Sequence, residues 1–317
     1  KLIGSDSRID VDLLKAEPRI NPRISRAFKV EDGSVDGWQL VWGAANSAKQ
    51  YGAQILTYHR VTGITRDGDR VAQVICTDEK TGEEVRITTN FVLNCAAAWG
   101  GQIAAMADCP DVQVVPGAGI MIAMNHRITN SVINRLTYPA DGDILVPVHT
   151  VCVIGTTDQK ADDPDQLKID WDEVQQMMDC GELLIPGFRK ARAIHAWAGA
   201  RPLVKDSRVG SGDTRHMSRG MSIIDHSDRD GLKGLLTIAG GKLTTYRLMA
   251  EKVVDAMCAQ LDDPRPCRTA TEQVPGSESG KNYVITHRLE EREHDRTDDQ
   301  ILCECELMSR GMFTRAL

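Results

Sequence analysis

The sequence predicts a mixed α/β protein in which a mostly antiparallel β region is inserted into an α/β part. Three observations lead to this fold class. A helical pattern at residues 35–52 is followed directly by a strand pattern at 54–58. Short strands then alternate with loops from residue 112 to 224. Finally, an apolar strand at 234–239 runs through two glycines into another helix.

The first third of the chain alternates between helix and strand patterns. Asp36 has the residue type of an N-cap for the helix at 35–52, which Gly52 ends. The hairpin-forming turns at 67–69 and 80–83 contain Asp-Gly and Thr-Gly pairs. The other expected elements are strands at 26–30, 54–58, 61–66, 71–77, 84–89 and 91–95, and a helix that ends near residue 107.

The inserted β region holds one helix at 171–184, with Asp170 as its expected cap. After the return strand, a helix begins beyond Gly240-Gly241-Lys242 and continues to Leu261. Residues 262–300 are polar and contain prolines, which is typical of a linker. The expected strands of the insertion are 120–124, 144–147, 151–155 and 221–225.

Composition excludes several classes of protein. The 317 residues carry a net charge of −7, which argues against nucleic acid as the main partner because phosphate binding needs a basic field. No apolar run reaches the roughly 20 residues that span a bilayer. Nine irregularly spaced cysteines favour a reducing, cytoplasmic setting over a disulfide framework. The opening Lys-Leu-Ile-Gly-Ser has no signal-peptide features, and we expect a piece of a longer protein.

The strongest chemical signal is the strand, glycine pair and helix at 234–261. Glycines allow a close approach of backbone to ligand, and the N–H groups at a helix start favour negative charge. Lys242 and Arg247 add positive charge beside Gly240 and Gly241. A glycine pair at such a turn is also common for structural reasons alone, so the pattern by itself leaves both interpretations open.

Several motifs in one order resemble FAD-dependent glycerol-3-phosphate dehydrogenases. Asp36 at its helix start belongs to this pattern, and Cys303-Glu304-Cys305-Glu306 narrows it toward the anaerobic members. The longer motifs are Gly155-Thr156-Thr157-Asp158, Arg201-Pro202-Leu203-Val204 and Gly240-Gly241-Lys242-Leu243-Thr244-Thr245-Tyr246-Arg247. The resemblance covers essentially the whole chain.

This resemblance implies a D-amino-acid-oxidase-like flavoprotein fold, with a discontinuous FAD-binding domain and an inserted substrate domain. The implied reaction oxidises sn-glycerol 3-phosphate to dihydroxyacetone phosphate, with FAD as the hydride acceptor. Electrons would leave through flavoprotein and membrane-anchoring iron–sulfur partner subunits to quinone. The implied location is the cytoplasm, at the periphery of the inner membrane through those partners.

The resemblance also divides the chain into parts. The substrate domain would comprise residues 1–34 and 112–232, and the FAD-binding domain 35–111 and 233–262. A linker would follow at 263–300, and the start of a 2Fe-2S domain at 301–317. No Gly-x-Gly-x-x-Gly follows any strand of this sequence, so the family's dinucleotide fingerprint and its first hundred or so residues are expected to be missing. We therefore expect the chain alone to be inactive or to bind FAD weakly.

Candidate site residues follow from the matched motifs. Cys303 and Cys305 would supply half of a 2Fe-2S site, which needs four cysteines. Ala97 stands where the family has a glycine near the flavin. The implied substrate-binding residues are Arg201, Arg219 and Lys242. The implied cofactor-binding residues are Ala97, Trp99, Gly240, Gly241, Leu243 and Thr244.

Alternatives remain at this point. Arg201 could make a structural ion pair instead of binding phosphate, Arg219 could be a surface loop residue, and Trp99 could serve packing. His149, His195, His216 and His226 show no metal-ligand spacing, and we interpret them as scattered surface or core residues. The whole chain could instead be another oxidoreductase of the same fold, or a non-catalytic assembly module without flavin. No catalytic base is identified.

Overall fold

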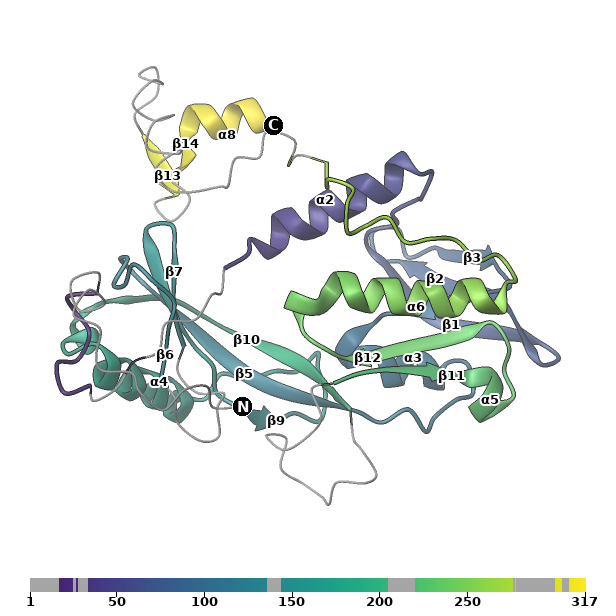
Figure 1. Cartoon of the computed structure of the whole chain (residues 1–317), viewed down its shortest axis with the longest axis horizontal. Coiled ribbons are helices and arrows are strands. Elements are labelled where there is room, and N and C mark those ends of the chain that lie inside the picture. Colours follow the sequence, from purple (N-terminus) through teal and green to yellow (C-terminus); the bar gives the residue numbers. More distant parts are fainter. Residues whose placement is uncertain are drawn as a thin grey trace.

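The computed structural model describes residues 17–24, 27, 34–135, 144–204, 220–275, 277, 300–303 and 308–317. Within this part, helices and mostly antiparallel sheets are mixed, which confirms the predicted fold class. Figure 1 shows the long strands β5 (Val114–Met124) and β10 (Ala193–Val204) running from the region of α4 (Trp171–Leu184) toward the region of β12 (Leu235–Gly240).

A three-stranded antiparallel sheet forms from consecutive hairpins, β1 (His59–Asp67), β2 (Arg70–Asp78) and β3 (Glu84–Thr88). Gly68 and Gly82 have φ angles of +61° and +76°, a conformation that residues with a Cβ rarely adopt. The turn chemistry in the sequence therefore predicted these hairpins correctly.

The inserted β region is a six-stranded antiparallel sheet packed against α4. Asp170 caps this helix by accepting a hydrogen bond from Asp172 N, as predicted. Ile120, Ile122 and Ile154 form the sheet side of the core, and Met177 and Phe188 cover them. The strand order is β10-β5-β8-β7-β6, where β8 is Val151–Gly155, β7 is Ile144–Val148 and β6 is Ile133–Asn134; β9 (Gln159–Lys160) also pairs with β5.

A third sheet has the order β11 (Met221–Asp225), β12 and β4 (Val92–Asn94). Every residue of β12 is buried, because α6 (Tyr246–Gln260) packs on it through Val253 while Leu235 packs in a cluster with α3 (Gly100–Ala105). Burial on both faces explains why this strand is a continuous apolar run. β12 pairs parallel with β4 and antiparallel with β11.

Three expectations about elements need correction. Strand 221–225 was expected in the inserted sheet, but it pairs with β12 instead. The expected strand at 54–58 is wrong: these residues form an irregular segment and a turn, because no neighbouring strand offers them a ladder within the described residues. The expected strand at 26–30 lies, apart from Ala27, outside the described residues.

The remaining elements include α2 (Gly37–Gln50), whose N-cap Asp36 accepts from Trp38 N and Gln39 N as predicted. Near the end of the chain lie β13 (Ile301–Cys303), β14 (Met308–Ser309) and α8 (Arg310–Ala316). None of the helices in the described ranges combines the length and apolar character needed to cross a bilayer.

Candidate active site

Arg201 lies on β10, opposite Gly117 of β5. Its guanidinium crosses β5 and donates hydrogen bonds to Thr157 O at 3.0 Å and to Asp158 Oδ1 at 3.3 Å. A third hydrogen bond goes to Thr156 Oγ1. A Cβ at Gly119 would lie 2.7 Å from Arg201 Nη2 and 2.4 Å from Thr157 O. The glycine at this position therefore makes room for the arginine.

The Arg201–Asp158 ion pair is partly buried, with side-chain exposures of 24% and 7%. This geometry gives Arg201 a structural role in its apolar surroundings. The side chain of Arg201 is nevertheless not fully buried, so the pair leaves room for a second anion to approach it. Phosphate binding by Arg201 accordingly stays a prediction.

The turn after β4 connects Asn94 to α3 and contains the short helix η1 (Ala97–Trp99). Ala97 has a φ angle of +49°, in the left-handed region where glycine is favoured. Trp99 Nε1 donates a hydrogen bond to Asp165 Oδ1 at 3.1 Å, and the Trp99 ring is partly exposed. η1 contacts β5, β10 and β12. The turn therefore lies where the six-stranded sheet meets the β11-β12-β4 sheet.

Gly240 and Gly241 have φ angles of +76° and +77°. A Cβ at Gly240 would lie 2.2 Å from Gly220 O, and one at Gly241 would lie 2.3 Å from Met249 Sδ. The folded chain itself thus requires both glycines, whether or not a ligand approaches. Lys242 and the short helix η4 (Leu243–Thr245) follow, and all four residues are exposed.

The predicted residues of the turn at 96–100 and of the segment after Gly240 lie at one edge of the sheet. Because β4 and β12 are parallel neighbours, the turn at 96–100 and the segment 241–245 both leave from carboxyl ends of adjacent strands. In open α/β sheets, ligands bind at this edge. Val204, at the end of β10, lies 3.5 Å from the Cβ position of Gly240, so the strand that carries Arg201 ends at the same place.

Two of the predicted site residues fall outside the described residues, Arg219 and Cys305. Cys303 lies half-buried on β13. The structure therefore neither supports nor opposes the half-cluster of cysteines.

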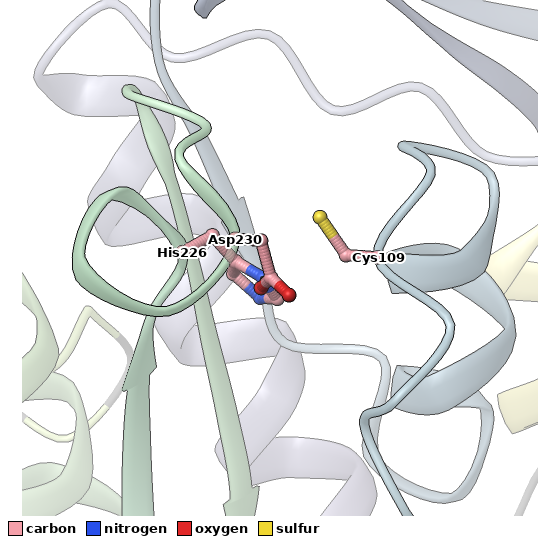
Figure 2. Close-up of side chains that lie close together, drawn as sticks. All are labelled: Cys109, His226 and Asp230. Carbon is pink, nitrogen blue, oxygen red and sulfur yellow. The ribbon is translucent and has the colours of Figure 1, made fainter.

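Sequence reasoning missed a buried cluster near the amino-terminal end of β12, opposite the edge just described. His226 and Asp230 lie on α5 (His226–Asp230), and Cys109 approaches them from the segment after α3 (Figure 2). One possible ligand atom from each residue lies within 4.8 Å of the others. His226 Nδ1 and Asp230 Oδ2 are only 2.6 Å apart, which is a hydrogen-bond distance. The spacing of these histidine and aspartate residues, i and i+4, was the one available signal in the sequence.

The chemistry of the cluster favours hydrogen bonding over metal binding. Arg66 Nη2 donates a hydrogen bond to Cys109 Sγ at 3.5 Å. The positive charge of the guanidinium therefore already lies beside the sulfur, where it would repel a metal cation. Burial raises the pKa of the Cys109 thiol, and the charge of Asp230 raises it further. A protonated thiol is a poor metal ligand, because the thiolate is the coordinating form.

Comparison with known proteins places the chain in a family. The family model for FAD dependent oxidoreductases (DAO) matches residues 2–247. A subunit of the anaerobic glycerol-3-phosphate dehydrogenase of Escherichia coli (strain K12) is 39% identical over 316 residues, which cover 93% of this chain and 58% of that protein. The protein of the same name from Haemophilus influenzae is 38% identical over 97% of this chain and 58% of its own length. The chain thus spans about 58% of the length of these relatives.

A solved structure confirms the fold. Glycerol-3-phosphate dehydrogenase from Bacillus halodurans, complexed with FAD, superposes with a TM-score of 0.67 at 22% identity. The match covers 89% of this chain and 54% of that one. Together with the family match over residues 2–247, the shared fold shows that this chain belongs to the FAD dependent oxidoreductases of the D-amino-acid-oxidase-like type.

Proposed function

We propose that the chain is part of an enzyme that oxidises sn-glycerol 3-phosphate to dihydroxyacetone phosphate. The observation that carries this proposal is the 39% identity, over 93% of the chain, to a protein named as a subunit of anaerobic glycerol-3-phosphate dehydrogenase. FAD, when bound, would accept the hydride from C2 of the substrate.

The described residues fit one end of a flavin. The edge at the carboxyl ends of β4 and β12 presents an exposed segment, Lys242–Thr244, at the start of a helix. A helix start and an ammonium group are both suited to negative charge. A glycine fingerprint for the pyrophosphate does not occur in the 317 residues, so these residues fit the flavin ring end rather than the whole cofactor.

Arg201 and Lys242 would bind the substrate phosphate. Asp158 compensates part of the charge of Arg201 and holds its planar fork in place across β5. Lys242 is exposed and contributes a point charge beside the helix start. A phosphate dianion would therefore be bound by the planar guanidinium of Arg201 and the ammonium group of Lys242.

The finer assignments belong to the same proposal. The six-stranded sheet would form the substrate domain, and the β11-β12-β4 sheet would be part of the FAD-binding domain. Cys303 and Cys305 would contribute two ligands to a 2Fe-2S cluster completed by further cysteines. The relatives are each named as one subunit of a dehydrogenase, which supports partner subunits through which electrons would pass to quinone at the cytoplasmic side of the inner membrane.

Steady-state kinetics of the enzyme that contains this chain, with an artificial electron acceptor, test this proposal. Arg201→Leu should lower kcat/KM for glycerol 3-phosphate, because a charged hydrogen-bond partner is removed. The decrease should correspond to a loss of about 2–4 kcal/mol of transition-state stabilisation. Lys242→Met should lower kcat as well. Glycerol, which lacks the phosphate, should be a poor substrate and much less sensitive to Arg201→Leu.

Asp158→Asn separates binding from structure, because it weakens the ion pair and leaves the guanidinium in the protein. If it reduces activity as much as Arg201→Leu does, then the arginine acts only through the ion pair. Turnover of an amino acid instead of glycerol 3-phosphate would overturn the proposed substrate while leaving the family intact.

A further inference from the structure

Buried hydrogen bonds connect α5 to the turn at 96–100. His226 Nε2 lies 2.9 Å from Thr237 Oγ1 on β12, and Asn94 Nδ2 on β4 lies 3.1 Å from the same oxygen. His226 and Thr237 are fully buried and Asn94 is 3% exposed. Asn94 Nδ2 also donates to Gly100 O at 2.8 Å, and its Oδ1 accepts from Ala96 N at 3.2 Å. One amide side chain therefore contacts both ends of the turn.

The direction of each hydrogen bond follows from the carboxylate at the far end. An ionised Asp230 can only accept, so His226 Nδ1 carries the proton in their 2.6 Å hydrogen bond. Burial lowers the pKa of His226 and keeps the ring neutral, so Nε2 is an acceptor for the Thr237 hydroxyl. The Thr237 oxygen then accepts from Asn94, which requires the amide nitrogen of Asn94, and not its oxygen, to face Thr237.

The turn needs such support because its backbone is strained. Ala97 has a φ angle of +49°, a conformation that persists only when its surroundings hold it. A flipped Asn94 amide would put its oxygen against Gly100 O and its nitrogen against Ala96 N, so both hydrogen bonds of the turn would be lost.

We propose that Asp230, His226 and Thr237 are positioning residues that fix the Asn94 amide and thereby hold the turn at 96–100 in its observed conformation. Only the assignment of this turn to the flavin site rests on the proposed function. The test below needs no flavin, so its failure is distinguishable from failure of the proposed function.

Hydrogen–deuterium exchange of the 317-residue chain tests the proposal with two variants of one buried residue. Thr237→Val keeps the shape of the side chain but removes the hydroxyl, and it should speed amide exchange in peptides covering 94–101 by roughly tenfold or more. Thr237→Ser retains the hydroxyl and should restore exchange to within about twofold of the wild type. Peptides from the hairpin of β1 and β2 are the internal control, and their exchange should not change.

A second pair of variants covers the case in which Thr237→Val does not fold. His226→Gln places a carbonyl oxygen where Nε2 accepts from Thr237 and should keep the turn protected, whereas His226→Leu should not. Faster exchange spread evenly over the chain, or equal exchange at 94–101 in the Val and Ser variants, would overturn the positioning role. Equal exchange at 94–101 in the Gln and Leu variants would do the same.

Discussion

At the scale of single residues, the sequence selected candidate side chains but did not indicate what they contact. Arg201 stood out because it lies in an apolar stretch, but its partner Asp158 is 43 residues away and is reached only through the register of β5, β8 and β10. His226 was interpreted as one of several scattered surface or core histidines, because the histidines show no metal-ligand spacing. Thr237 and Asn94, which complete its network, are 143 residues apart in the sequence.

Ala97 illustrates a position where sequence and structure agree. The resemblance placed it where the family has glycine, and its φ angle of +49° gives the physical reason. Ala97→Gly should raise the free energy of unfolding by about 0.5–1 kcal/mol. Relief of the left-handed conformation contributes about 1–2 kcal/mol, and the greater freedom of glycine in the unfolded chain removes about 0.4–1 kcal/mol of that gain.

Urea unfolding of the two adjacent variants measures this difference. Ala98→Gly is the matched control, because Ala98 is buried and has no positive φ angle. It should lower the free energy of unfolding by about 0.5–1 kcal/mol or more. If both glycine variants destabilise the chain equally, the backbone at Ala97 is not strained.

At the scale of elements, local signals predicted helices and hairpins, whereas long-range pairing escaped prediction. α2 and α4 begin at aspartate caps that the sequence displays, and the β1–β2 turn carries its own Asp-Gly pair. β10 was missed because Gly199 and Pro202 interrupt any strand pattern, yet pairing along β5 from Ala193 to Val204 makes it a strand of 12 residues. Residues 54–58 have the residue pattern of a strand, but no strand among the described residues pairs with them.

The contact between α5 and β12 should make stability depend on pH. Burial lowers the pKa of His226 in the folded chain, against opposing contributions from Asp230 and Asp225, while Arg229 acts in the same direction as burial. In the unfolded chain the pKa of histidine is about 6.5. Below pH 7 the unfolded state therefore binds a proton that the folded state does not, and stability falls as the pH falls toward the folded pKa.

Chemical denaturation between pH 7.5 and 5.5 measures this effect. His226 should contribute up to about 1.4 kcal/mol of lost stability per pH unit within its window. His226→Gln should reduce the slope, whereas His195→Gln, at an exposed position on β10, should retain the wild-type slope. An unchanged slope in His226→Gln would show that His226 titrates alike in both states.

At the scale of the whole molecule, the fold class was predictable and the assembly of the site was not. The order of helix and strand patterns was enough to indicate an inserted antiparallel region. The meeting of β4, β10 and β12 depends on a parallel pairing between segments some 140 residues apart, which no local pattern encodes. This meeting point nevertheless brings together the turn at 96–100, the segment 240–244 and the end of the strand that carries Arg201.

The absence of a glycine fingerprint in the 317 residues leads to a prediction about FAD. Under the proposed function, the described edge would hold the ring end of a flavin, while no part of the 317 residues offers the Gly-x-Gly-x-x-Gly turn that binds a pyrophosphate. Losing two charge-assisted hydrogen bonds costs about 3 kcal/mol, which corresponds to a Kd roughly 100-fold weaker. The 317-residue chain should therefore bind FAD at least about 100-fold more weakly than the Bacillus halodurans glycerol-3-phosphate dehydrogenase, whose structure is complexed with FAD.

Fluorescence titration with two flavins tests which end of the cofactor the chain contacts. Riboflavin lacks the pyrophosphate. A chain that contacts only the ring should therefore bind FAD and riboflavin with Kd values within about threefold of one another, a difference of less than about 0.7 kcal/mol in binding free energy. Glycerol-3-phosphate dehydrogenase from Bacillus halodurans, whose structure is complexed with FAD, is the reference and should prefer FAD over riboflavin. A yellow 317-residue protein purified with stoichiometric FAD would contradict the prediction, since the pyrophosphate would then have donors that the glycine fingerprint does not supply.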